Sequence, residues 1–223
     1  MPLDSTRPYT LTLKAAKESV SLTDRNSKMP GSAFSSDSFA CKVGSKLAEI
    51  KGSICESCYA RRIQKIRPSV NKGWVANYEK SVNLIATNPD KWVAACVFQI
   101  NRFAQKTGEK YHRWFDSGDL DSIEQLAAIC KVAEETPDIA HWLPTRELAI
   151  VRVYKGAIPS NLVIRLSAPM VDMKPVKGAN TSTVHKDSTP VGHVCPAPTQ
   201  GNNCGSCRAC WTPSVANVSY KKH

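Results

Sequence analysis

The chain has 223 residues, 42% of them hydrophobic, which is enough apolar material for one substantial core. Its 30 Lys and Arg outnumber 19 Asp and Glu and give a net charge of +11, so nucleic acid stays open as a partner. The sequence has no run of eighteen apolar residues and no signal-peptide pattern. We therefore expect a single domain over residues 1–223, no membrane association and a cytoplasmic location.

The first third of the chain, residues 1–68, is rich in Ser, Pro, Gly and Lys. We expect it to be irregular apart from short extended pieces such as Tyr9–Leu13. It carries the first cysteine group, Cys41 followed by Cys55-Glu-Ser-Cys58, among glycines and serines typical of a loop. A single C-x2-C pair also occurs in thioredoxin-type sites and zinc knuckles, so its meaning depends on the other cysteines.

The densest basic stretch, Arg61–Arg67, follows this cysteine pair directly. An anionic substrate, nucleic acid or an acidic electron donor would each bind such a stretch. The alternatives are a solvated face, or cations that offset the negative charge of a thiolate-bound cluster. Because no RNA- or DNA-binding motif accompanies the charge, the sequence favours these alternatives.

Helices and strands alternate through residues 69–170, where the hydrophobic periodicity is clear. This alternation implies right-handed crossovers and a largely parallel sheet. We predict an α/β fold, either a partial (β/α) barrel or an open mostly parallel sheet, with Cys-rich loops in the N-terminal third and at the C-terminus. The expected elements are a helix over Val70–Ile85, a second after the Asn88 cap over Trp92–Phe103, a strand over Tyr111–Phe115, a helix capped by Asp121, a strand over Ile139–Leu143, a helix from Glu147 to about Gly156, and a strand over Leu162–Leu166.

Polar side chains follow each predicted strand, and the carboxyl ends of parallel strands converge on one crevice. Asp119 is alternatively a helix cap, and Arg165 alternatively lies on a solvated edge strand, because a charge inside a buried strand needs a partner. An arginine in the crevice would pair with a carboxylate or phosphate. The catalytic candidates are Asp116, Asp119, Arg146, Arg165 and Ser167, and the cofactor-binding candidates are Tyr59, Ser117, Gly118 and Thr145.

The C-terminal segment, residues 171–223, holds the most informative motif, a C-x2-C-x2-C run. Thiolates at this spacing wrap one face of a [4Fe-4S] cluster and take a fourth ligand from elsewhere. Zinc fits less well because zinc sites usually use two separate C-x2-C pairs, and disulfides are a further alternative. The favoured ligands are Cys204, Cys207 and Cys210 with Cys195; Cys41, Cys55 or Cys58 is the rival fourth donor or part of a second cluster, and Cys96 and Cys130 are expected in the core.

Four segments together are familiar: Gly52–Ala60, Trp114–Asp119, His141–Arg146 and the run that ends in Cys210-Trp211. In this order they resemble a family of small bacteriophage proteins named after gene product eighty-eight of a mycobacteriophage. More distantly, they are similar to radical S-adenosylmethionine enzymes, and this resemblance implies a (β/α) barrel fragment that holds a [4Fe-4S] cluster. Those enzymes use C-x3-C-x2-C, whereas thirteen residues separate Cys41 from Cys55 here, so S-adenosylmethionine binding is not carried over.

Three classes of function are compatible with these features. The strand-end polar groups favour an iron–sulfur enzyme that binds a small anionic or nucleotide ligand and takes electrons from a donor. The lack of a recognisable open-coordination motif favours a one-electron carrier or redox sensor. The charge of +11 favours a zinc-stabilised nucleic-acid-binding protein. In a phage-encoded protein the expected location is the host cytoplasm.

Overall fold

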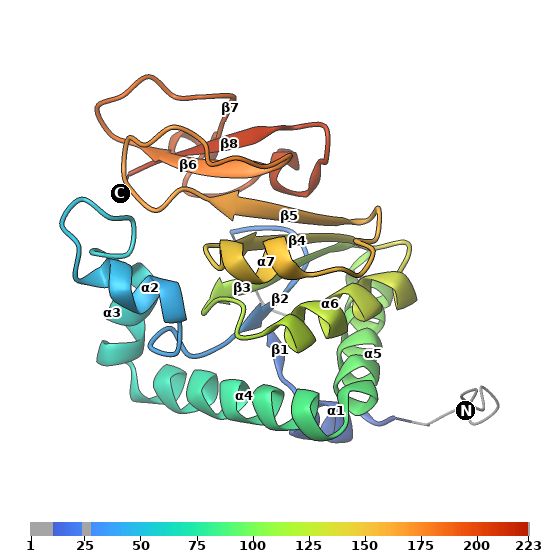
Figure 1. Ribbon diagram of the computed structural model, residues 1–223. Helices are drawn as coiled ribbons and strands as arrows, with labels where there is room; N and C mark the ends of the chain where they lie inside the picture. The colour runs from blue at the N-terminus through green and yellow to red at the C-terminus, as the bar shows by residue number, and fades with distance from the viewer. Residues whose placement is uncertain (1–10, 24–27, 223) are drawn as a thin grey trace.

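The structure is a computed structural model that describes residues 11–23 and 28–222 (Figure 1). The described part of the chain contains helices and strands along its whole length. In chain order they are α1 (Leu13–Ser19), β1 (Leu22–Thr23), β2 (Ser32–Ser35), α2 (Lys42–Ala48), α3 (Tyr59–Ile66), α4 (Pro68–Thr87), α5 (Pro89–Thr107), β3 (Tyr111–Ser117), α6 (Ile123–Glu135), β4 (Ala140–Thr145), α7 (Leu148–Val153), β5 (Leu162–Ser167), β6 (Thr181–His185), β7 (His193–Val194), the 3-10 turns η1 (Ala197–Thr199) and η2 (Ala209–Trp211), and β8 (Asn217–Lys221).

The strands form one eight-stranded sheet in the order β1-β2-β3-β4-β5-β6-β8-β7. Only β1 runs antiparallel to its neighbour, and the other described pairs are parallel. From β2 to β6 neighbouring strands are consecutive in the chain, so the sheet is wound in one direction, as in a (β/α) barrel. This confirms the predicted α/β fold with an open, mostly parallel sheet. No helix within the described residues has the length and apolar character needed to cross a bilayer.

The main core lies between the sheet and the helices α1, α4, α5 and α6. Trp92 of α5 stacks on Trp114 of β3 with ring centroids 5.8 Å apart, and Phe34 of β2 contacts both rings. Cys96 and Cys130 are buried in this core, as expected. Asn88 both ends α4 and caps α5 through its side chain, which accepts from the Lys91 N–H at 3.1 Å.

Two expectations about helix starts were wrong. The helix α6 is capped by Ser122, whose Oγ accepts from the Gln125 N–H at 3.2 Å. The carboxylate of Asp121 instead accepts from the Tyr78 hydroxyl at 3.0 Å and pairs with Lys42 at 3.4 Å. Leu13 begins α1 rather than ending an extended piece, while Tyr9 and Thr10 lie outside the described residues.

The N-terminal third is not irregular, contrary to expectation. It contributes three helices and two strands, and β2 pairs with β1 on one side and β3 on the other. The four residues of β2 are all buried, so this strand shows none of the alternation that identifies a half-buried strand in sequence. The segment after β5 was likewise expected only as a Cys-rich loop, yet it adds β6, β7 and β8 to the sheet.

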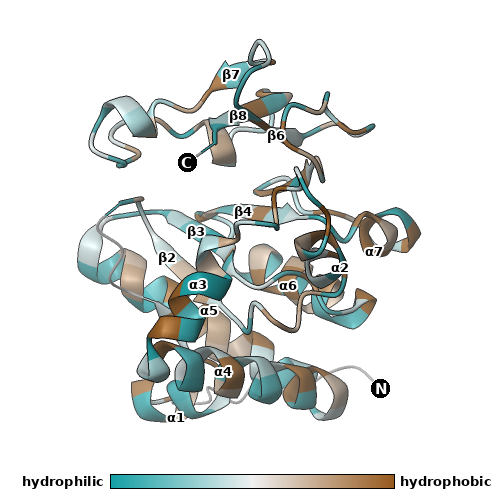
Figure 2. Ribbon diagram, turned by 90° about the vertical axis from the view of Figure 1, so that its left-hand side faces the viewer, coloured by the Kyte–Doolittle hydropathy of each residue, from teal (hydrophilic) through white to brown (hydrophobic). Residues whose placement is uncertain are grey.

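The face of the sheet opposite the main core is covered by the C-terminal segment. Trp211 lies against Trp142 of β4 and Tyr111 of β3, with ring centroids 5.2 and 5.4 Å away, and its indole N–H donates to the carbonyl of His112 at 2.9 Å. These contacts place Trp211 over the amino-terminal halves of β3 and β4. The helices α2 and α3 lie instead toward the carboxyl ends, and Figure 2 shows α3 mostly in the colour of hydrophilic residues.

Candidate functional site: two cysteine groups and a pocket

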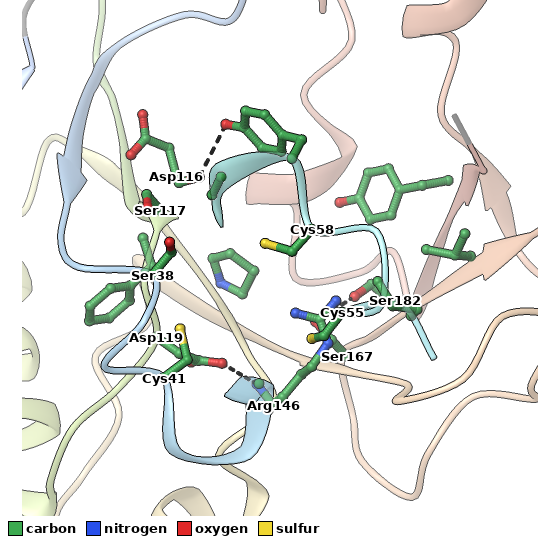
Figure 3. A pocket seen from close by; sticks show the side chains of 18 of the residues that line it. Ser38, Cys41, Cys55, Cys58, Asp116, Ser117, Asp119, Arg146, Ser167 and Ser182 are labelled. Atoms are coloured by element: carbon green, nitrogen blue, oxygen red, sulfur yellow. Dashed lines mark hydrogen bonds between the residues drawn. The ribbon is translucent and has the colours of Figure 1, made fainter. Parts of the chain in front are cut away.

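A pocket of about 440 Å³ opens at the carboxyl ends of the central strands (Figure 3). It collects most of the residues that the sequence indicated, from segments far apart in the chain. Thr145 is buried, and its hydroxyl supports the wall by donating to Asp119 at 2.6 Å. The indicated residues that line the pocket are Cys41, Cys55, Cys58, Tyr59, Asp116, Ser117, Gly118, Asp119, Arg146 and Ser167.

Three cysteines enter this pocket from the segment that connects β2 to α3; we call them the pocket cysteines, Cys41, Cys55 and Cys58. Cys41 is the N-cap residue of α2 and Cys58 that of α3, so both side chains sit where helical N–H groups are free. Cys55 lies on the loop between them. The loop is fixed to the exit of β5 by the Ile54 N–H, which donates to the carbonyl of Pro169 at 3.0 Å.

Because Gly44 has no side chain, the sulfur atoms of Cys41 and Cys55 can both lie close to it. A β-carbon at this position would lie 2.9 Å from Cβ of Cys41 and 3.7 Å from the sulfur atoms of both Cys41 and Cys55. The two sulfurs are therefore at most twice that second distance apart. Only glycine fits here without displacing the cysteine backbone or side chain.

Burial keeps the thiols of Cys41 and Cys55 protonated in the protein without metal. Burial raises the pKa of Cys41 far above its ordinary value, and the nearby Asp119 carboxylate adds to the effect. Burial also raises the pKa of Cys55, while Arg146 opposes the shift. A metal that binds these sulfurs must displace their protons, so its uptake depends on pH.

The carboxylates of Asp119 and Glu147 accept hydrogen bonds that fix the backbone around the pocket. Oδ1 of Asp119 accepts from Thr145 Oγ1 at 2.6 Å and from the Leu120 N–H at 2.8 Å, and Oδ2 accepts from the Arg146 N–H at 2.9 Å. Burial raises the pKa of this carboxyl group although these hydrogen bonds oppose the shift. Glu147, which the sequence reading missed, accepts from the Val43 N–H at 2.8 Å and so ties the first turn of α2, next to Cys41, to the end of β4.

The other four cysteines do not line the pocket; we call them the C-terminal cysteines, Cys195, Cys204, Cys207 and Cys210. They surround a cavity of about 20 Å³ together with His193 and Trp211. The Cys204 N–H donates to the Lys28 carbonyl at 2.7 Å, which ties the group to the chain before β2. The structure thus places Cys195, and not a pocket cysteine, with the C-x2-C-x2-C run.

Arg165 was expected in the crevice, but it does not line the pocket. Its side chain is fully buried and points toward the C-terminal cysteines. The guanidinium donates to carbonyls of the Cys-rich segment and of β6: Nε to Cys210 at 3.0 Å, Nη1 to Val215 at 2.9 Å and Thr181 at 3.3 Å, and Nη2 to Ala209 at 2.7 Å and Thr212 at 3.0 Å. The positive charge of Arg165 inside a buried strand is therefore stabilised by backbone carbonyls, and not by a ligand in the pocket or by solvent.

Tyr220 of β8 lies between the two groups, because it lines the pocket and also contacts Cys210, with 3.1 Å between its hydroxyl and the sulfur. Burial raises the pKa of Cys210 to about 12, and the hydrogen bond from Tyr220 opposes the shift. Arg113 lines the pocket beside it and stacks on Trp142, 4.7 Å from the ring centroid. One layer of side chains separates the pocket from the C-terminal cysteines.

The thiols are not arranged around a common point that would suit a single ion. Among residues 11–23 and 28–222, no group of three or more His, Cys, Asp or Glu side chains is placed so that it could hold a metal ion. Comparison with known proteins matches the chain to a family model described as Gene product 88, over residues 11–213. No curated protein and no solved structure matches the chain.

Proposed function

We propose that this chain, which belongs to the Gene product 88 family of bacteriophage proteins, is an iron–sulfur enzyme. Its substrate site is the pocket at the carboxyl ends of the strands, and Cys41, Cys55 and Cys58 hold a [4Fe-4S] cluster there. One observation carries the proposal: these three thiols line the same pocket as Asp116, Arg146 and the other strand-end residues. A protein that only carried electrons would need no such pocket.

The pocket cysteines suit a cluster better than a single ion. Zinc binds thiolates at about 2.3 Å, which requires sulfur atoms gathered tightly around one point, and the described side chains offer no such group. A cluster presents several irons to ligands that stand farther apart. The pocket of about 440 Å³ and the space at Gly44 leave room for it. Bound through three cysteines, a cluster would supply one-electron chemistry and an iron with an open coordination position.

The C-terminal cysteines supply a complete set of four ligands. We propose that they hold a second [4Fe-4S] cluster whose irons are all bound by protein, suited to electron storage or transfer. A structural zinc ion is the alternative at this group: the cavity of about 20 Å³ is close to the space of one water molecule, although here too the side chains would have to draw together around the ion. An electron donor and a small anionic or nucleotide ligand are the proposed partners.

Nucleic acid is the less favoured partner. Arg61, from the basic stretch, lines the pocket, but its guanidinium stacks on Phe39 at 4.8 Å and donates to Ser45 at 3.1 Å. Lys65 also lies over the Phe39 ring, at 5.8 Å. Part of the basic stretch is thus committed to contacts within the protein and to the pocket, which favours a small ligand over an extended strand.

The test is anaerobic purification followed by iron, sulfide and zinc analysis of the wild type and two variants. We expect about four irons and four sulfides for each occupied group. Cys58→Ser should remove the metal of the pocket and Cys207→Ser that of the C-terminal group, each without emptying the other. Cys96→Ala, in the core, is the matched control and should keep all the metal. A wild type with zinc but no sulfide would refute the proposal, and zinc confined to the C-terminal group would refute only the second cluster.

A further inference from the structure

Arg146 lines the same pocket as Cys41, Cys55 and Cys58. It follows β4 directly, and its backbone is fixed by the N–H that donates to Asp119 Oδ2 at 2.9 Å. Figure 3 shows its side chain extending from beside Asp119 toward Cys55 and Ser167. The guanidinium therefore faces the space that a ligand beside these cysteines would occupy.

Among the described residues this guanidinium forms no ion pair within 4 Å, although the Asp119 carboxylate lies close enough to attract it. Its Nε is buried and has no hydrogen-bond partner among the described residues. Asp119 is the nearby carboxylate, yet its oxygens already accept from Thr145, Leu120 and the backbone of Arg146. A buried guanidinium donor without a partner costs free energy, and a bound anion would remove that cost.

Hydroxyl donors and further positive charge surround the same space. Ser167 and Ser182 line the pocket and form a hydroxyl pair with oxygens 3.0 Å apart. The Oγ of Ser117 is buried and unpaired within the described part of the chain. The other cationic side chains that line the pocket are Arg61, Arg113, Lys221 and Lys222, against the two carboxylates Asp116 and Asp119.

We infer that Arg146, with Ser167 beside it, binds an anionic oxygen group of the ligand, either a carboxylate or a phosphate. Arginine presents a planar fork that matches both groups, and the serine hydroxyls add neutral donors. The inference deepens the proposed function, since it states which part of the ligand lies next to the pocket cysteines. Binding of the anion itself needs only residues of this chain and can be measured apart from any reaction.

The experiment titrates the full-length, anaerobically purified protein with sodium pyrophosphate and with sodium succinate by calorimetry at constant ionic strength. We expect at least one of the two anions to bind, and Arg146→Gln to weaken binding at least about tenfold through loss of a charge-assisted pair. Ser167→Ala should weaken it less. Arg102→Gln removes an equal charge from the exposed surface of α5 and should change nothing. Arg146→Lys distinguishes the phosphate from the carboxylate. Lysine still binds phosphate as a point charge, but it cannot form the two parallel hydrogen bonds that arginine makes to a carboxylate.

Two results would overturn the inference: neither anion binds the wild type, or Arg146→Gln binds as tightly as Arg102→Gln. Iron and sulfide are measured on the same samples, and circular dichroism checks that each variant folds. Loss of anion binding at full iron content supports Arg146 as the anion site. A protein that holds no iron yet binds the anion through Arg146 keeps this inference and refutes the proposed function.

Discussion

The two cysteine groups are built differently, although both come from loops. The pocket cysteines number three, flank a cavity of about 440 Å³ and face charged side chains. The C-terminal cysteines number four and lie beside Trp211 and a cavity of about 20 Å³. A complete ligand set in a small space suits a structural or electron-storing role, whereas an incomplete set in a large pocket suits chemistry on a ligand. Variants that affect one group and spare the other test this difference.

The largest expected effect follows from Arg165, which donates to Thr181 of β6 and otherwise to carbonyls of the Cys-rich C-terminal segment. Arg165→Met keeps the apolar stem but removes five hydrogen bonds to carbonyls that are buried or partly buried. We expect a loss of about 3–5 kcal/mol in the free energy of unfolding, the scale of breaking a buried charged network. Denaturant unfolding measures the loss, and metal analysis should show the C-terminal metal released before that of the pocket. If both cysteine groups lost their metal equally, the idea that the two groups are structurally independent would be contradicted.

The next effect should reach both groups together, because it arises in the core beneath them. His112 and His141 are buried with ring centroids 5.6 Å apart. Burial lowers the pKa of His141 to about 3, and burial together with the neighbouring His141 lowers the pKa of His112. Both side chains are therefore neutral in the folded protein, and protonation favours the unfolded chain.

Their contribution to stability is complete above the unfolded pKa of about 6.5 and is lost as the pH falls toward the folded values. We expect the free energy of unfolding to fall by about 1.4 kcal/mol per pH unit for each histidine below pH 6. Denaturant unfolding of metal-free protein between pH 7 and pH 5 measures the slope. His141→Gln should roughly halve it, and an unchanged slope would assign the effect to other groups.

Gly44→Ala should disturb the pocket cysteines alone. The added methyl group would lie 2.9 Å from Cβ of Cys41, so the cysteine must move. We expect about 1–3 kcal/mol of destabilisation, typical of overpacking, and loss of the pocket metal with the C-terminal metal retained. The control is Gly73→Ala in α4, where an added β-carbon meets nothing within 4 Å and the gain in helix propensity is about 1 kcal/mol. If Gly44→Ala kept all the metal of the pocket, metal binding would not depend on the close approach of the Cys41 and Cys55 sulfur atoms seen in the structure.

The elements that could be predicted from sequence are those with strong local signals. The helices α4 and α5 follow from periodicity and from Asn88-Pro89 between them, and β3 to β5 from short apolar runs that alternate with helices. The location of the strand-end residues could also be predicted, because the carboxyl ends of parallel strands meet at one edge of the sheet. Asp116, Asp119 and Arg146 were therefore assigned to one site without any information on side-chain packing, and all three line the pocket.

What escaped prediction depends on partners far along the chain. Four of the five carbonyls that accept from Arg165 lie 44–50 residues away, and a backbone carbonyl has no sequence signature. Glu147 resembled a residue that starts a helix, yet its carboxylate accepts from Val43, 104 residues earlier in the chain. The strands β2 and β6 consist mainly of small polar residues and show no apolar alternation. They form because they pair with neighbouring strands of the sheet. The favoured grouping of Cys195 with Cys204, Cys207 and Cys210 could be predicted from the sequence, whereas only the fold separates the rival donors Cys41, Cys55 and Cys58 from that group.

The smallest effect concerns Tyr220, which touches both sites. Burial raises the pKa of its hydroxyl well above the ordinary value, so the group stays a neutral donor. When Cys210 is a metal-bound thiolate, this hydroxyl donates to the sulfur 3.1 Å away and stabilises the more negative, reduced state. Tyr220→Phe removes one hydrogen bond of about 1 kcal/mol, so we expect the midpoint potential of the C-terminal cluster to fall by about 40 mV.

A redox titration followed by electron paramagnetic resonance measures this potential. The matched control is Tyr154→Phe, because the Tyr154 hydroxyl is hydrogen-bonded to Cys130, a core cysteine outside both groups. That variant should leave both potentials unchanged. If Tyr220→Phe shifts the signal of the pocket cluster and not that of the C-terminal one, the assignment of the two groups is reversed. If the C-terminal group gives no redox signal and holds zinc, it stabilises the fold while the pocket alone carries the electron chemistry.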